Sequence, residues 1–251
     1  MAKQDGFHPV IGTLGKTTFY RTKDGYFARE KTSIAPGRIL TDPAFKRQQD
    51  NMSEFSRAGK AGRLMRDTLK EPLKVVTDRL LIRRMTTKLM EIVKSDPVGS
   101  RGSRKIQDGN LQLLKDFEFN SNSLLSGIFK APFSTAVDRA SGILTVDFPS
   151  FIPESVIKAP VGTTHFQIIA AAGEFDFEND KALADIKMGN PLPLNKTATA
   201  PLSFTCNVTP GTVHALFLIC GISYYEEVNG EMHLLTSGSY NALKIVVVNT
   251  I

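Results

Sequence analysis

The stretch VHALFLICGISYYEEVNGEMHLL, residues 213–235, decides the fold class of this chain. Its first half is apolar at both alternating positions, which is typical of a strand with neighbours on both sides. Asn229 and Gly230 then form the two-residue turn of a β-hairpin, which places Glu226 opposite His233. A long central strand that returns through a tight turn predicts an antiparallel sheet.

Further strands are expected on both sides of this stretch. Apolar and polar residues alternate over residues 144–148 and again over 202–208, as in half-buried strands. Residues 163–172 predict a second central strand, and residues 242–248 predict the last one. We therefore expect about seven strands in residues 108–251, arranged as an antiparallel β-sandwich of immunoglobulin-like or jelly-roll type.

A helical region comes before the sandwich. Asp42 followed by Pro43 marks a helix start, because the carboxylate caps free amides and proline fits the first helical position. We expect this helix to end near residue 69. Gly59 and Gly62 each cost about 1 kcal/mol in a helix interior, so their presence indicates that another backbone approaches closely. The expected apolar face consists of Phe45, Met52, Phe55, Gly59, Gly62, Met65 and Leu69.

A second helix is expected over residues 73–94, and it forms a helical hairpin with the first. Residues 96–103 have the composition of a flexible connector, and a third short helix is expected over 105–116. We place the regional boundary here and expect a fragment of residues 108–251 to stay folded. The expected packing face of the second helix consists of Leu81, Met85, Leu89 and Ile92.

Residues 16–31 predict another β-hairpin near the N-terminus. Its turn contains Gly25, and its strands place Tyr20 opposite Phe27. A two-stranded hairpin alone is marginal in water, so it must dock either on its own chain or on a neighbouring subunit. For docking between subunits, the candidate assembly contacts are Tyr20, Phe27, Gly59 and Gly62.

The net charge of +6 is distributed unevenly along the chain. The N-terminal arm, residues 1–40, carries +4; the basic helical region, residues 41–107, carries +8; and the sandwich domain, residues 108–251, carries −6. This asymmetry favours a polyanion partner for the first part or a head-to-tail contact between copies, and solvated charge is the alternative. The candidate polyanion contacts are Arg57, Lys60, Arg79 and Arg83.

No motif in the sequence predicts a catalytic, cofactor-binding or metal site. Residues 12–17, GTLGKT, resemble part of a phosphate-binding loop, but Val10 stands where that loop needs a glycine. The carboxylates between Glu174 and Asp180 are expected on a solvated strand face, with a calcium site as the less favoured reading. The histidines and cysteines are scattered without ligand spacing, and the cysteines lie in apolar strands. They are His8, His165, His214, His233, Cys206 and Cys220.

The chain shows neither the apolar core of a signal peptide in its first residues nor eighteen consecutive apolar residues anywhere. We therefore expect a cytoplasmic protein that does not insert into membranes.

Four stretches resemble those of uncharacterised bacterial proteins of similar length. They are residues 15–31, GKTTFYRTKDGYFAREK; 54–66, EFSRAGKAGRLMR; 116–120, DFEFN; and 146–153, VDFPSFIP. The resemblance implies a bacterial protein and brings no activity and no site residue.

These observations predict an α+β chain that is a non-enzymatic structural or interaction protein, forming a homo-oligomer or larger assembly. The alternative is a nucleic-acid-associated protein that uses the basic helical region, although no aromatic residues are interleaved there for base stacking. The third possibility is a sandwich that binds a ligand, but the chain has no tryptophan for a sugar platform.

Overall fold

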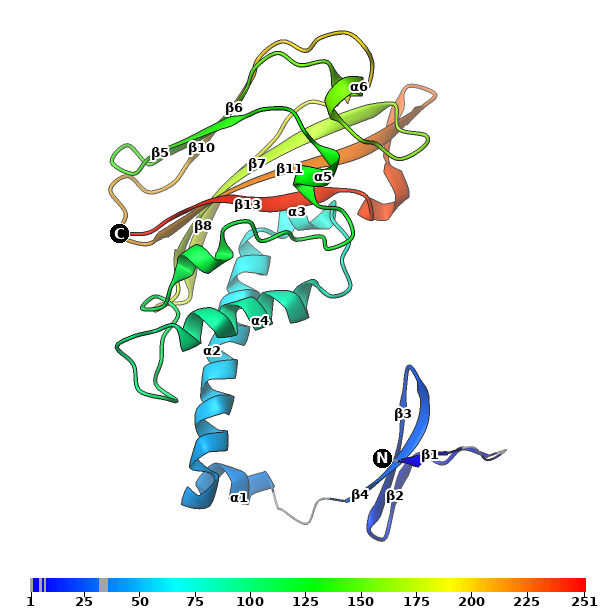
Figure 1. Cartoon of the computed structure of the whole chain (residues 1–251), viewed down its shortest axis with the longest axis vertical. Helices are drawn as coiled ribbons and strands as arrows, with labels where there is room; N and C mark the ends of the chain where they lie inside the picture. The colour runs from blue at the N-terminus through cyan, green and yellow to red at the C-terminus, as the bar shows by residue number, and fades with distance from the viewer. Residues whose placement is uncertain (1, 5, 7, 32–35) are drawn as a thin grey trace. The chain divides into compact units, whose positions relative to one another are not determined.

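The structure is a computed structural model that describes residues 2–4, 6, 8–31 and 36–251. The chain divides into two compact units, Met1–Asp50 and Asn51–Ile251. Figure 1 shows mixed α and β structure, as expected from the sequence. Among the described residues, no helix is long and apolar enough to cross a bilayer.

The first unit contains a four-stranded antiparallel sheet with the strand order β1-β4-β3-β2. The expected hairpin is confirmed: Tyr20 pairs with Phe27, and Gly25 has a positive φ of 124° at the turn. The sequence patterns did not predict the two short outer strands, one of which pairs with each strand of the hairpin. The strands are β1 (Ala2–Lys3), β2 (Gly12–Leu14), β3 (Thr17–Thr22) and β4 (Gly25–Glu30).

Two short helical segments and one long helix follow, in place of the single helix expected from residue 41 to 69. They are α1 (Pro36–Thr41), the 3-10 turn η1 (Pro43–Phe45) and α2 (Lys46–Thr68). Asp42 caps η1 by accepting a hydrogen bond of 2.9 Å from the Ala44 amide, as the sequence predicted. The second expected helix is divided into α3 (Lys70–Lys74) and α4 (Leu81–Lys94).

The packing face of α4 is confirmed, whereas that of α2 is confirmed only towards its C-terminal end, where Gly62, Met65 and the adjoining Leu69 are buried. Leu81, Met85, Leu89 and Ile92 are all buried. On α2, however, Met52 and Phe55 are exposed, and nothing lies within 4 Å of a Cβ built on Gly59. The expectation was wrong for the N-terminal half of α2, where the side that carries Glu54, Ala58 and Ala61 is buried and the Gly102 amide bonds to Glu54. The buried residues of α2 are Glu54, Ala58, Ala61, Gly62 and Met65.

The segment between α4 and the sheets forms a hydrogen-bonded loop that folds back onto α2. The Asp96 carboxylate accepts bonds from the amides of Val98, Gly99 and Lys105, at 2.7–2.9 Å. Glu54 on α2 accepts a 2.8 Å bond from the Gly102 amide, which explains why an acid is buried there. In place of the third helix expected at 105–116, the structure has only the 3-10 turn η2 (Leu111–Leu114).

The second unit contains two antiparallel sheets. The larger sheet runs β12-β11-β7-β8, with β13 also paired to β11 and β9 to β7, and the smaller one runs β10-β6-β5. The expected hairpin at Asn229 and Gly230 is confirmed, with Glu226 opposite His233. The strands are β5 (Ser134–Asp138), β6 (Ile143–Phe148), β7 (His165–Asp176), β8 (Lys181–Met188), β9 (Leu192–Pro193), β10 (Leu202–Asn207), β11 (Ala215–Val228), β12 (Glu231–Leu234) and β13 (Ala242–Asn249). The short helices are α5 (Leu125–Ile128), α6 (Pro153–Val156) and η3 (Leu235–Gly238).

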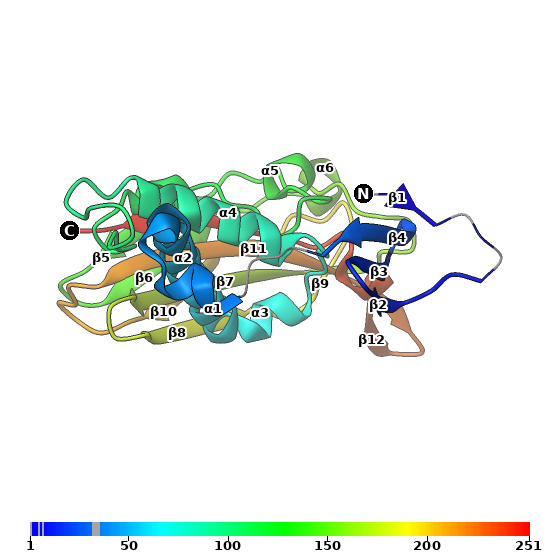
Figure 2. The ribbon, with the colours of Figure 1, turned by 90° about the horizontal axis from the view of Figure 1, so that it is seen from below.

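Strands β7 and β11 are buried on both faces, because the larger sheet is the middle one of three layers. Figure 1 shows the larger sheet between the smaller sheet and the helices, and Figure 2, seen from below, shows α2 and α4 in front of the sheets. Leu216 and Leu218 point into a core shared by the two sheets, while Phe217 and Ile219 point into a core shared with α2 and α4. Both parities of these strands are therefore apolar. The paired sheets are compatible with the expected sandwich.

The shared helix–sheet core leads to a prediction for the fragment of residues 108–251. The division at this boundary stays a prediction, but removing the helices uncovers an apolar sheet face that includes Phe217, Ile219 and Leu243. We now expect this fragment to aggregate or to bind a hydrophobic dye, because exposed apolar patches of this kind associate. Size-exclusion chromatography with dye fluorescence measures this, and residues 51–251 serve as the control. A monomeric fragment with little dye binding would restore the original expectation.

Candidate interaction surfaces

The N-terminal sheet carries aromatic and arginine side chains on a face that is not buried. Among its described residues none is buried. The Tyr20 and Phe27 rings stack on one face with centroids 6.1 Å apart. The Arg29 guanidinium lies 5.5 Å from the Tyr20 ring centroid, and that of Arg21 lies 5.4 Å from the Tyr26 centroid. Aromatic and arginine side chains are enriched in protein interfaces.

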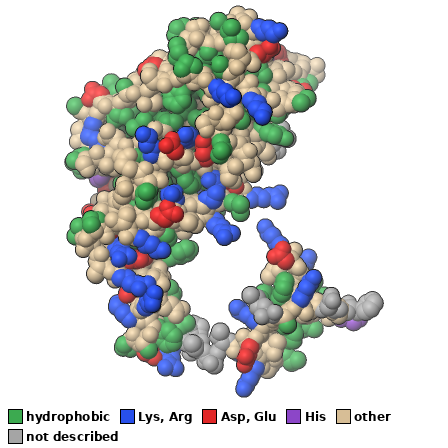
Figure 3. Space-filling model, in the orientation of Figure 1, with side chains coloured by type: hydrophobic (Ala, Val, Ile, Leu, Met, Phe, Trp, Pro, Cys, Tyr) green, Lys and Arg blue, Asp and Glu red, His purple; other side chains and the backbone are tan. Residues whose placement is uncertain are grey.

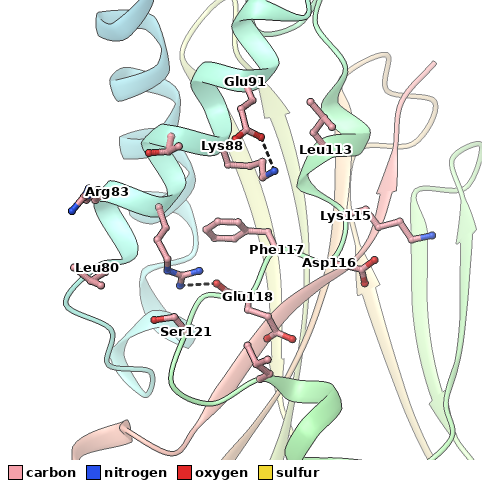
Figure 4. A pocket seen from close by; sticks show the side chains of 13 residues that line it. Leu80, Arg83, Lys88, Glu91, Leu113, Lys115, Asp116, Phe117, Glu118 and Ser121 are labelled. Carbon is pink, nitrogen blue, oxygen red and sulfur yellow. Dashed lines mark hydrogen bonds and ion pairs between the residues drawn. The ribbon is translucent and has the colours of Figure 1, made fainter.

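Two grooves flank α4 in the second unit, where Figure 3 shows Lys and Arg side chains over the helical region. The first groove, about 630 Å³, lies between α4 and residues 113–124. Figure 4 shows the Phe117 ring in this groove, with Lys88 and Glu91 on the α4 side and Glu118 on the other.

Most charged groups in this first groove are already paired within the chain. Arg84 donates to the Asp78 carboxylate at 2.7 Å and to the Glu118 carbonyl at 2.8 Å, and its guanidinium covers the Phe117 ring. Lys88 lies 2.6 Å from Glu91. Burial raises the pKa of the Glu118 carboxyl, which accepts a hydrogen bond from an amide of α5.

The first groove contains one serine, Ser121, whose hydroxyl is bonded to a carboxylate that is itself held by an arginine. A nucleophile needs a base within hydrogen-bond reach that is itself oriented by a third group. The Ser121 hydroxyl donates to Asp78, but this carboxylate is held by Arg84, and no histidine lines the groove among the described residues. The geometry describes a structural ion-pair network beneath an open apolar surface.

The second groove, about 750 Å³, lies between α2 and α4, and we call it the α2–α4 groove. Phe55 and Ile82 supply exposed apolar surface, with 59% and 60% of each residue accessible. Among the described residues, Arg79, Arg83 and Lys94 of this groove have no acidic partner within 4.0 Å. The groove thus combines apolar surface with unpaired positive charge.

The structure separates the expected polyanion contacts into two places. Arg79 and Arg83 line the α2–α4 groove. Arg57 and Lys60 line a hollow of mixed charge with Glu178, and Arg57 also donates to the Arg104 carbonyl at 2.9 Å.

The four expected assembly contacts also lie in different parts of the structure and differ in burial. Tyr20 and Phe27 are half-buried on the N-terminal sheet, and Gly59 borders open space. A Cβ on Gly62 would lie 3.2 Å from the Leu89 side chain, and its three nearest neighbours are all side-chain atoms, so α4 of the same chain approaches Gly62 through side chains and not through the backbone expected from the sequence.

The acidic residues 174–180 do not form one strand face. Glu174 is buried and accepts hydrogen bonds from Thr209 and Thr212, and Asp176 accepts from Asn179 in the turn after β7. Glu178 forms a 2.9 Å ion pair with Lys105. Within the described part of the chain, no three His, Cys, Asp or Glu side chains are grouped to hold a metal ion. Cys206 and Cys220 are free and buried, and burial raises the pKa of the Cys206 thiol to about 11.

The β11–β12 hairpin, residues 225–234, is the surface that sequence reasoning used only to assign the fold. Its tip is exposed and contains Glu226, Glu227 and Glu231 without any Lys or Arg. Val228 and Met232 are also exposed there, at 43% and 39%. The sequence pattern that could have indicated this surface is three glutamates and two apolar residues around an Asn-Gly turn.

Comparisons of this chain with protein-family models, with curated proteins and with solved structures find no match.

Proposed function

We propose that this protein is a non-enzymatic, self-associating structural subunit whose N-terminal sheet docks on another copy. The observation that carries the proposal is a four-stranded sheet in which no described residue is buried. A sheet of three or more strands needs either a hydrophobic face or a packing partner for stability of its own, and none of the described residues of this sheet is buried. Its stacked aromatic and arginine side chains supply a surface suited to such cover.

Charge supports docking between copies. The arm carries net positive charge, whereas residues 108–251 carry −6. Attraction between unlike surfaces speeds association and orients the partners. Polyanion binding is the second candidate, since Arg79, Arg83 and Lys94 lack acidic partners among the described residues.

Deleting residues 1–35 tests this proposal. We expect the intact protein to form oligomers and the shortened protein to stay folded but to sediment at a clearly lower mass, because one docking surface has been removed. High salt should loosen the intact oligomers only in part, since exposed charge pairs are screened beyond about 8 Å while apolar contacts persist. Sedimentation velocity at low and high salt measures the masses, and circular dichroism checks folding.

A substitution pair sharpens this experiment. Tyr20→Thr with Phe27→Thr keeps strand-forming residues but removes the stacked rings, so it should weaken association. Tyr240→Thr is the control, because Tyr240 is an aromatic residue outside the N-terminal sheet and is 50% exposed. An intact protein that stays monomeric at high concentration and low salt contradicts the proposal. A monomer that gains mass only with added oligonucleotide supports the polyanion alternative instead.

A further inference from the structure

The β11–β12 hairpin and the α2–α4 groove are complementary in charge and in apolar surface. The hairpin tip presents Glu226, Glu227 and Glu231, and the groove presents Arg79, Arg83 and Lys94 with Glu91. Each surface also exposes large apolar side chains. We propose that the β11–β12 hairpin of one copy docks in the α2–α4 groove of a second copy.

The β11–β12 hairpin projects from the sheet and carries glutamate side chains without basic partners among the described residues, as such a contact requires. Figure 2 shows β12 projecting at one end of the larger sheet. Its tight turn fixes the tip, because Asn229 and Gly230 take positive φ values of 55° and 86°. Glu226 and Glu231 have no basic partner within 4.0 Å among the described residues, while Glu227 lies 3.8 Å from the His165 ring.

The α2–α4 groove has enough volume for the hairpin tip, and it exposes apolar side chains that the tip would cover. Its volume of about 750 Å³ is within the range of sites that enclose small ligands or several side chains. Phe55 and Ile82 would lose exposed apolar area to Val228 and Met232 of the hairpin. In such an interface apolar contact supplies affinity, and the surrounding charges set orientation and association rate.

Other acidic and apolar segments of the chain fit the groove less well. The turn after β7 is acidic, but Glu178 is paired with Lys105 and Phe177 packs into the helix–sheet core. The N-terminal sheet of another copy is basic, so like charge disfavours its docking in this groove. The hairpin combines unpaired acids with exposed apolar residues.

Because hairpin and groove are different surfaces, the contact is head-to-tail. Each copy then offers one hairpin and one groove, and repetition gives a closed ring or an extended filament. The inference rests on the proposed function and names a second contact of the same assembly, beside the one made by the N-terminal sheet.

A charge exchange in the full chain tests the contact. The groove variant carries Arg79→Glu and Arg83→Glu, and the hairpin variant carries Glu226→Arg and Glu231→Arg. In a solution of either variant alone, the hairpin and the groove carry charges of the same sign. We therefore expect the affinity of each variant for itself to fall by about tenfold or more. In an equal mixture, the basic hairpin of one variant meets the acidic groove of the other, and the remaining native pair also matches. Sedimentation velocity should therefore show that mixing restores the mass of the unaltered assembly.

The control reverses exposed charges elsewhere, with Glu154→Lys and Lys196→Glu, and should leave the mass unchanged. The inference is overturned if either charge-reversed variant assembles like the unaltered protein, if mixing restores nothing, or if the control weakens association equally. In the first case, loss of assembly on deletion of residues 1–35 would still support the proposed function. An unaltered protein that is monomeric would overturn both.

Discussion

Replacing Phe217 with alanine should lower the free energy of unfolding by about 3–5 kcal/mol. Phe217 is fully buried where β11 faces the helices, and its ring centroid lies 5.4 Å from that of Phe175 and 6.5 Å from that of Phe177. The substitution removes these contacts and leaves a cavity between two rigid layers. Because domains are stable by only about 5–15 kcal/mol, this is a large fraction of the total.

Urea unfolding followed by circular dichroism measures the effect on Phe217→Ala. Phe55→Ala is the matched control, because 59% of Phe55 is exposed and its loss should change stability by about 0.5 kcal/mol or less. Equal unfolding midpoints for the two variants would show that the helices do not cover this face of the sheet.

Replacing Asp78 with asparagine should destabilise the protein by about 2 kcal/mol at neutral pH, and the difference should shrink in acid. Asp78 is 2% exposed at its side chain and joins the start of α4 to the loop that follows Phe119. Its carboxylate accepts hydrogen bonds from Leu80 and Ser121 and from the Arg84 guanidinium, which lies 2.7 Å away. Without this charge Arg84 loses its ionic partner.

The pH dependence follows from the lowered pKa of Asp78. Burial alone would raise this pKa, but the hydrogen bonds from Ser121, Leu80 and Arg84 outweigh it and lower the value from 3.8 to about 2. The stabilisation is therefore complete above about pH 4 and is lost as the pH falls towards 2.

Unfolding curves at neutral pH and at several acid pH values measure the difference between Asp78→Asn and the unaltered protein. Asp67→Asn is the control, because the Arg63–Asp67 pair is exposed and should contribute less than about 1 kcal/mol. A difference for Asp78→Asn that stays constant between pH 4 and pH 2 would contradict the role assigned to its carboxylate.

Local chemistry was enough to predict both hairpin turns, the packing face of α4 and the strands β3, β4, β6, β7 and β10 to β13, whereas it missed β1, β2, β5, β8 and β9. Each turn depends on one or two residues that adopt a positive φ, Gly25 in the N-terminal hairpin and Asn229 with Gly230 in the other. The α4 face follows from the helical period, since apolar residues recur there without interruption by small ones.

The buried face of α2 and the candidate interaction surfaces were not predictable in the same way. Glu54 is buried because Gly102, far away in the sequence, donates to its carboxylate. Glu178 is paired because Lys105 lies beside it, whereas Glu226 and Glu231 have no such neighbour among the described residues. Sequence shows where the charges are, but a charge is paired or free only through contacts between distant segments.

Side-chain period, turn chemistry and composition specify the α+β class, the antiparallel pairing and the separation of charge along the chain. They do not specify that β7 and β11 serve two cores, that Phe55 and Ile82 remain exposed, or that the α2–α4 groove and the β11–β12 hairpin keep unpaired charges. Burial and pairing depend on which elements meet in space, and neither the helical nor the strand period specifies the partner.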